Sequence, residues 1–112
     1  MRPFGIVVLT MLAAVGMSNM AMAQGETKAG GAAVYKANCV LCHGEDGHAQ
    51  TTLGKQLKAH DLHSAEVEKK TDAQLKNVIT NGQNSMPPFK GQLSPPQISQ
   101  VLSYVRALGK KK

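Results

Sequence analysis

The stretch NCVLCHGEDG, residues 38–47, holds the only two cysteines of the 112-residue chain, Cys39 and Cys42, and a histidine, His43, directly after the second. Thiols three positions apart share one side of a single helical turn, and the imidazole follows them immediately. Such a cluster can close a disulfide, bind a metal ion or attach a cofactor. The remainder of the chain discriminates among these chemistries.

Three alternatives use the thiols without a large cofactor. A zinc site usually takes four nitrogen or sulfur ligands, so the motif would need His48 or His60 as a fourth, and adjacent Cys and His seldom both reach one tetrahedral ion. A thioredoxin-like pair requires a βαβ context, and no such pattern is visible. A plain disulfide suits an exported protein. All three stay open as alternatives to the following one.

The pattern C-x-x-C-H is the attachment signature of c-type haem. Two thiols at positions i and i+3 can reach the two vinyl groups on one edge of a porphyrin, and the next imidazole then lies under the ring. The sequence therefore favours one haem c per chain, attached through Cys39 and Cys42, with His43 as an iron ligand.

The first residues predict a signal peptide. Arg2 is the only charge in residues 1–23, an apolar run of about 14 residues follows at 4–17, and Ala-Met-Ala at 21–23 is a suitable cleavage site. The run is shorter than the roughly 20 residues of a membrane span. We expect cleavage after Ala23 and an exported chain, residues 24–112, without stable membrane insertion. An uncleaved anchor is the alternative.

Composition points to a core that the polypeptide does not complete alone. Once residues 1–23 are removed, the formal net charge falls from +6 to about +5. Met86 is then the only methionine of the chain, and there is no Trp. The aromatic residues left are Tyr35, Phe89 and Tyr104. A domain this small often needs a cofactor or staple. A large apolar group is expected at its centre.

Helical signals dominate the chain. Residues 24–30 are expected to be a flexible lead-in and 30–38 a first helix, with Ala33, Val34 and Ala37 on its buried side. Residues 44–70 show no clear period and are expected to be loop, with at most one short turn or helix. No alternating run predicts a strand.

Two further helices carry stronger signals. Thr71 and Gln74 have capping-box spacing before a face of Leu75, Val78 and Ile79, and Gly82 can end that helix. Ser94 and Gln97 repeat the box, with Pro95 at the first helical position. Apolar residues then follow at Ile98, Val101, Leu102, Val105 and Leu108, up to Gly109. The expected fold is all-α, with three or more short helices and long loops.

Met86 is the candidate for a second iron ligand. It lies in NSMPPFK, residues 84–90, where two prolines restrict the backbone, and histidine with methionine suits an electron-transfer haem. The alternative is that Met86 fills the core, as methionine often does. His48, His60 and His63 lie in a polar loop and are expected to face solvent or bond locally. They are the next candidates if Met86 is not a ligand.

Four stretches together resemble the small class I cytochromes c, the single-haem electron carriers of the bacterial c and c6 type, over nearly all of 30–108. They are GAAVYKANCVLCHGEDG at 31–47, HDL at 60–62, NGQNSMPPF at 81–89 and QISQVLSYVRAL at 97–108. The resemblance implies the class I cytochrome c fold around one covalent haem with His43 and Met86 as axial ligands. It also implies a periplasmic one-electron carrier that is not an enzyme.

The resemblance also implies that Gly31 and Tyr35 pack against the last helix around Tyr104 and Val105. The chain departs from the family in one respect. Members usually have a proline after the motif whose carbonyl binds the ligand histidine, and residues 44–70 contain none. A carbonyl between Thr52 and Leu57 is expected instead. Candidate partners of the haem propionates are Lys55, Gln56 and Asn84.

The basic residues allow two interpretations. Lys36, Lys55, Lys58 and Lys90 can surround an exposed haem edge and guide docking to an acidic redox partner, or they can be ordinary solvated surface. Residues 110–112 form a basic, solubilising tail.

No patch predicts nucleic-acid binding. A monomer is expected. The alternative functions are a haem-binding subunit or ligand sensor of a larger redox complex, and a CxxC thiol or metal module.

Overall fold

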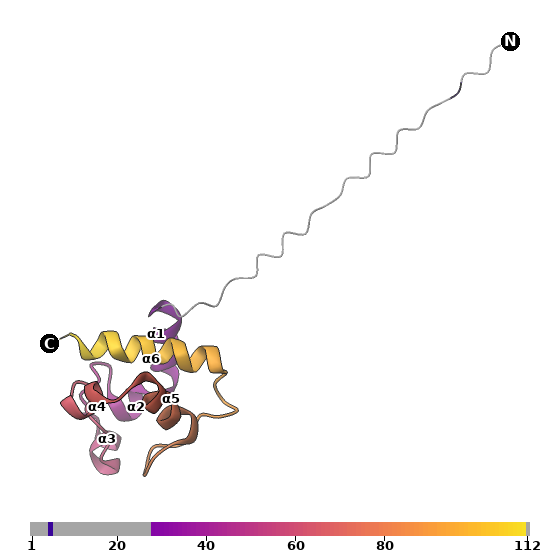
Figure 1. The fold of residues 1–112 in the computed structure, drawn as a ribbon. Coiled ribbons are helices and arrows are strands. Elements are labelled where there is room, and N and C mark those ends of the chain that lie inside the picture. The colour runs from indigo at the N-terminus through magenta and orange to yellow at the C-terminus, as the bar shows by residue number, and fades with distance from the viewer. Residues whose placement is uncertain (1–4, 6–27, 112) are drawn as a thin grey trace.

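The computed structural model describes residue 5 and residues 28–111, and within them it is helical without a strand (Figure 1). The predicted signal peptide lies outside the described residues apart from residue 5. The helices are α1 (Lys28–Asn38), α2 (Val40–His43), α3 (Thr52–Leu57), α4 (Ala65–Lys69), α5 (Asp72–Asn81) and α6 (Pro95–Gly109). The all-α prediction is confirmed, and α1 begins at Lys28, two residues before its expected start.

Both predicted capping boxes are present. The Thr71 hydroxyl accepts from the Gln74 amide at 3.1 Å, and the Gln74 side chain accepts from the Thr71 amide at 2.9 Å. Ser94 and Gln97 make the same pair of bonds at the start of α6, where Pro95 is the first helical residue. Each box satisfies amides that the first helical turn leaves without a partner.

The segment 44–70 contains two short helices, more than the one that was expected. Thr51 caps α3 and Ser64 caps α4, each by accepting from the amide three residues later. Helices of six and five residues are too short to show a hydrophobic period in the sequence. Their stability comes from the caps and from packing.

Helices α1 and α6 cross in close contact, as the resemblance implied (Figure 1). A Cβ atom on Gly31 would lie 2.1 Å from the Gln100 carbonyl oxygen, so only glycine permits this approach. The rings of Tyr35 and Tyr104 lie next to each other, with centroids 5.0 Å apart. Tyr35 and Val101 are each 1% exposed, and they form the centre of the core.

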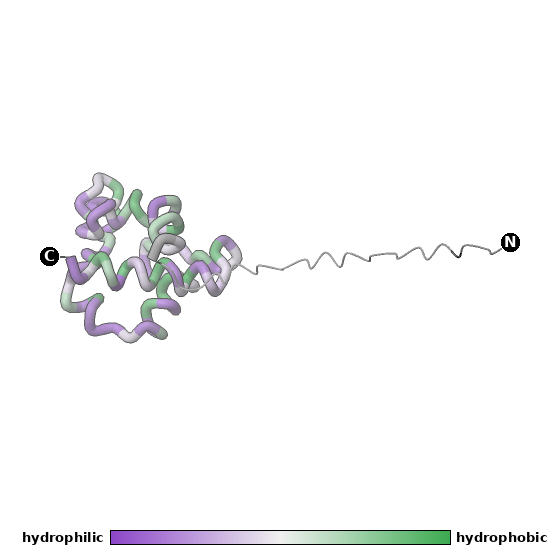
Figure 2. Tube along the Cα trace, turned by 90° about the horizontal axis from the view of Figure 1, so that it is seen from above, coloured by the Kyte–Doolittle hydropathy of each residue, from purple (hydrophilic) through white to green (hydrophobic). Residues whose placement is uncertain are grey.

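The prediction for the buried side of the first helix was partly wrong. Val34 is half-buried, but Ala33 and Ala37 are exposed, and the inner face is formed by Gly31, Val34 and Tyr35. Gly31 and Tyr35 face α6 because the close crossing leaves room for a glycine and for the Tyr35 ring, but not for other side chains at position 31. Figure 2 shows polar and apolar residues alternating along the helices.

Candidate functional site

Two cavities that share several lining residues open beside α2. Their empty volumes, which include space open to solvent, are about 730 Å³ and about 650 Å³. The residues lining both are Cys39, His43, His60, Gln83, Met86 and Phe89. We refer to the two cavities together as the cleft.

The inner and outer parts of the cleft differ in chemistry. The inner part is lined almost wholly by apolar side chains, among them Leu75, Val78, Ile79, Val101 and Leu102. The outer part is bounded by exposed residues at the end of α3 and in the loops, including Leu57, Lys58, Asn84, Ser85 and Pro87. An occupant of the cleft therefore has an apolar body and one edge near water.

The structure brings the four predicted site residues to this cleft. Cys39 and His43 line both of its parts, and Cys42 lines the outer part. Met86, from the turn after α5, also lines both parts. Both cysteines are free thiols and half-buried. Burial, and then the charge of Cys42, raises the pKa of the Cys39 thiol to about 11, so that thiol is protonated at neutral pH.

One hydrogen bond determines the tautomer of His43. Its Nδ1 atom lies 2.9 Å from the backbone oxygen of His60. A carbonyl oxygen can only accept, so Nδ1 carries the proton and the Nε2 lone pair is free to bind a metal. Burial lowers the pKa of His43, although the bond to His60 opposes this effect, so the ring favours the neutral form that ligates iron.

The position of that carbonyl corrects a prediction. The partner was expected between Thr52 and Leu57, but those residues form α3, and the oxygen that His43 contacts belongs to His60. The HDL stretch at 60–62 was noted for the resemblance but was not predicted to supply this oxygen. Without a proline in 44–70, a non-proline residue supplies the oxygen.

The backbone of the cysteine motif is held by residues that the sequence did not single out as site residues. The Thr51 hydroxyl donates to the Leu41 carbonyl at 2.7 Å, and the buried Tyr35 hydroxyl donates to the Gly44 carbonyl at 2.6 Å. A Cβ atom on Gly54 would lie 2.1 Å from the Cys42 oxygen, so glycine allows α3 to pack directly on α2. In the sequence, the only indication of this close contact was Gly54 itself, because a glycine within a helical segment often marks a close approach of another backbone.

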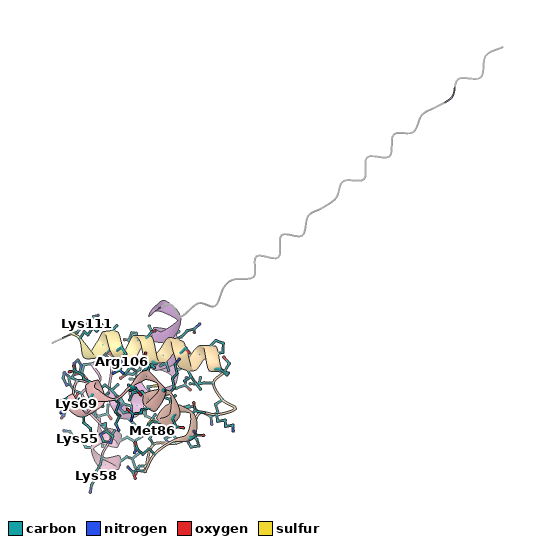
Figure 3. All side chains as sticks on the ribbon, viewed as in Figure 1. Lys55, Lys58, Lys69, Met86, Arg106 and Lys111 are labelled. Carbon is teal, nitrogen blue, oxygen red and sulfur yellow. The ribbon has the colours of Figure 1, made fainter. Side chains whose placement is uncertain are left out.

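A tight turn presents Met86. Gln83 and Met86 exchange two backbone hydrogen bonds, of 3.1 and 2.9 Å, and Asn84 between them has a φ of 53°. The turn is tied to the end of α5, since the Phe89 amide donates to the Ile79 oxygen at 3.0 Å. Figure 3 shows Met86 low in the centre of the molecule. Met86 is thus held by backbone bonds and not by a helix face.

The other histidines were expected to face solvent or bond locally, but the rings of His48 and His63 bond residues 13 and 17 positions away, and the exposed His60 also lines the cleft. The ring of His48 bonds Asp61 at 3.1 Å, the ring of His63 bonds the Asp46 oxygen at 2.6 Å, and His60 lies 3.8 Å from Glu66. Within residues 28–111, no three His, Cys, Asp or Glu side chains are grouped as metal ligands.

The predicted cationic and amide side chains divide into two groups. Asn84 lines the outer part of the cleft together with Lys58, which the propionate prediction omitted. Lys55 and Gln56, on α3, are exposed and do not line the cleft. Lys36 and Lys90, elsewhere in the chain, are also exposed and do not line it. Lys55 and Lys58 lie near each other at the lower left in Figure 3.

These residues fit a haem. Two thiols one helical turn apart, a neutral imidazole with a free Nε2 and an apolar cleft are the parts that a covalently attached haem requires. A haem held there supplies an iron that gains and loses one electron. Fold and site together define the c-type cytochromes as the class.

Comparison with known proteins specifies the family. A family model described as cytochrome c oxidase, cbb3-type, subunit III matches residues 26–105. Cytochrome c6 of Nostoc sp. (strain PCC 7120) is 42% identical over 84 residues, covering 71% of this chain and 68% of that protein. The solved structure of the KustC0563 c-type cytochrome aligns with a TM-score of 0.64 and 34% identity, covering 70% of this chain and 95% of that one.

A longer protein is also similar. The cbb3-type cytochrome c oxidase subunit FixP of Azorhizobium caulinodans is 37% identical over 90 residues, which cover 78% of this chain but only 30% of FixP. The chain belongs to the small class I monohaem cytochromes c. It is a haem-based electron carrier with one covalently attached c-type haem.

Proposed function

We propose that this protein is a periplasmic one-electron carrier whose haem iron is ligated by His43 and Met86. The observation that supports it is the placement of both side chains on the same two cavities, one from α2 and one from the turn after α5. Histidine and methionine ligation raises the reduction potential of a haem and keeps the reduced state accessible. With both axial positions filled, the iron has no open site for a substrate, so the chain is not an enzyme.

Export follows from residues 1–23, which have the three parts of a signal peptide. None of the helices in residues 28–111 has the length and hydrophobicity that crossing a bilayer requires. We infer cleavage after Ala23 and a carrier that moves between partners in the periplasm. The N-terminus of the purified protein, read by mass spectrometry, tests the cleavage.

The outer part of the cleft is the proposed route for electrons. Leu57, which lines the outer part, is 38% exposed, so apolar surface lies at the mouth of the cleft. Lys55 and Lys58 add positive charge on α3, next to Leu57. An apolar mouth with adjacent cations fits an acidic redox partner, because charge guides the encounter and apolar contact excludes water.

Absorption spectra of the exported protein, oxidised and reduced, test the ligation. A six-coordinate, low-spin haem in both states, unaltered by added carbon monoxide or cyanide at short times, shows that both axial positions are filled, and loss of that state in Met86→Ala identifies Met86 as the second ligand. A high-spin or five-coordinate reduced spectrum, or immediate binding of carbon monoxide, contradicts it.

The family model and the match to FixP favour a second candidate, a haem-binding subunit of a larger redox complex. Native electrophoresis of extracts from the source cells, stained for covalent haem, separates the two. A carrier migrates at the size of the monomer in the soluble fraction, whereas a subunit migrates with a large complex.

A further inference from the structure

Arg106 connects α6 to a distant part of the chain. Its Nε atom donates to the Asp72 carboxylate at 3.0 Å, and its two terminal nitrogens donate to backbone oxygens, of Val67 at 3.4 Å and of Lys70 at 2.5 Å. These partners lie 34 to 39 positions earlier in the chain, where α4 ends and α5 begins. The guanidinium therefore joins α4, α5 and α6.

The guanidinium supplies hydrogen-bond donors at the end of α4. The last carbonyls of a helix have no partner within it, and α4 has only five residues. The Val67 oxygen accepts from the Lys70 amide at 3.1 Å and also from Arg106, and the Lys70 oxygen accepts from Arg106 as well. A helix this short is not stable by itself, so its position depends on such tertiary contacts.

The end of α4 forms one wall of the cleft. Val67 and Lys70 line the inner part, together with Leu75 of α5 and Leu102 of α6. Val67, Leu75 and Leu102 are buried against one another as one apolar cluster. Arg106 lines neither part of the cleft, so it acts on this wall from outside.

The same stretch of backbone holds the His43 ring at its other end. We name residues 60–72 the wall segment. The His60 oxygen at its start accepts from the His43 ring at 2.9 Å, and the Lys70 oxygen near its end accepts from Arg106. The wall segment is therefore fixed near both ends, and its apolar residues between them line the inner part of the cleft.

The two bonds to carbonyl oxygens contribute more to this connection than the ion pair with Asp72. The Asp72 side chain is 69% exposed, and exposed ion pairs add little stability. The Arg106 side chain is only 28% exposed, and its bonds to the carbonyls are partly buried bonds from a charged donor, which are the stronger kind. A lysine at position 106 would keep the charge but lacks the planar fork that reaches several acceptors at once.

We propose that Arg106 is a positioning residue for the haem, which holds the wall segment against the inner part of the cleft and so keeps water from that side of the haem. This inference rests on the proposed placement of the haem in the cleft. Oxidised haem carries one positive charge more than reduced haem, and a charge is less stable where water is excluded. The reduction potential should therefore fall when the wall segment opens.

The test compares the wild-type holoprotein with Arg106→Lys, Arg106→Gln and Lys110→Gln by hydrogen–deuterium exchange and by potentiometric titration at neutral pH. The reporters are the Glu68 and Lys70 amides, which are hydrogen-bonded within the wall segment. They should exchange faster by about tenfold or more in both Arg106 variants, the factor that corresponds to loss of one hydrogen bond to a charged group, and the potential should fall in both. Lys110→Gln is the matched control, because it removes an exposed cation at the end of the same helix and should leave exchange and potential as in the wild type.

A wild-type potential in Arg106→Lys overturns the proposal, because charge alone then accounts for any change in Arg106→Gln. Exchange that stays unchanged in Arg106→Lys, or that increases as much in α1 as in the wall segment, also overturns it, since Arg106 then does not act on this wall in particular. Arg106→Lys still provides the answer if Arg106→Gln does not fold. Spectra showing other axial ligands or no covalent haem end the proposed function, whereas wild-type spectra with any of these results end only this inference.

Discussion

His43 and His60 are joined by a hydrogen bond of 2.9 Å between the Nδ1 atom of the first and the backbone oxygen of the second. The two residues are far apart in the sequence, on α2 and on the loop before α4. Because the bond uses Nδ1, Nε2 is the only nitrogen of this ring that can bind iron. The side chain of residue 60 has no part in this bond, so the carbonyl survives substitution there.

Covalent attachment can be checked by intact mass. The exported protein should have the mass of the chain from Gln24 plus one haem, and the haem should stay attached after denaturation. Cys39→Ala combined with Cys42→Ala should lose the covalent haem and, with it, the largest apolar body of the core. A wild-type mass of the chain alone would contradict attachment. A cooperative melt of the double variant with native helix content would contradict the role of haem in folding.

Substitution of Met86 tests the sixth iron position. Met86→Ala should keep the thioether attachment, lower the reduction potential and allow cyanide or carbon monoxide to bind, because the raised potential depends on the thioether. Met86→His is the companion variant and should restore six-coordination while leaving the potential low. Spectra and potentials of Met86→Ala that match the wild type would show that Met86 is only a packing residue.

Gly31 tests the crossing of α1 and α6. Gly31→Ala places a Cβ atom 2.1 Å from the Gln100 oxygen, so the helices must separate. We expect a loss of about 1–3 kcal/mol in the free energy of unfolding, typical of overpacking, although alanine favours helices. Ala33→Ser, at an exposed position of the same helix, should change it by less than about 0.5 kcal/mol. Chemical denaturation of the holoprotein measures both, and equal effects would rule out the contact as the cause.

The buried Tyr35 hydroxyl should make the folded protein less stable at alkaline pH. Burial raises the pKa of its hydroxyl far above the usual value of about 10, and the hydroxyl donates to the Gly44 oxygen at 2.6 Å. The folded state thus holds this proton to higher pH than the unfolded state does. The associated stability is complete below about pH 10 and is lost as the pH rises above it.

Tyr35→Phe should therefore lower stability at neutral pH by about 1–3 kcal/mol, since the buried Gly44 carbonyl loses its donor, and should weaken the decline above pH 10. Tyr104→Phe is the control, because the neighbouring ring is only half-buried. Denaturant melts at pH 7 and between pH 9 and 11 measure the effect. An alkaline decline that is the same in Tyr35→Phe and wild type would refute it.

Electron transfer should depend on salt if the lysines near the cleft guide docking. The rate of oxidation by ferricyanide, an anion, should fall as ionic strength rises, because the Debye length shrinks from about 10 Å at 0.1 M to about 3 Å at 1 M. Lys58→Glu should slow the reaction more than Lys111→Glu. Lys58 lines the outer cavity, and Lys111 lies beyond the end of α6, far from Lys58 in Figure 3. A rate that does not change with ionic strength, or equal effects of the two substitutions, would show that these lysines do not guide docking.

Local signals in the sequence were sufficient for much of the fold. The spacing of Cys39, Cys42 and His43, the capping boxes of α5 and α6, and the proline-flanked Met86 each depend on residues within a few positions of one another. Backbone geometry over one or two turns determines such features, so a single sequence contains the information. The haem class follows from the same short motif, and ligation by Met86 remains a prediction.

Contacts between distant segments required the tertiary structure. The resemblance implied that Gly31 faces α6, but no local pattern shows that Ala33 and Ala37 are exposed, because the buried side of α1 depends on how closely the two helices cross. The carbonyl that binds His43 was expected on α3 and belongs to His60, since any backbone oxygen is chemically equivalent until the chain is folded. The stacking of His48 on His63 has the same origin. The sequence by itself identified the groups predicted to perform the chemistry, and packing decided which backbone atoms and distant side chains hold them in place.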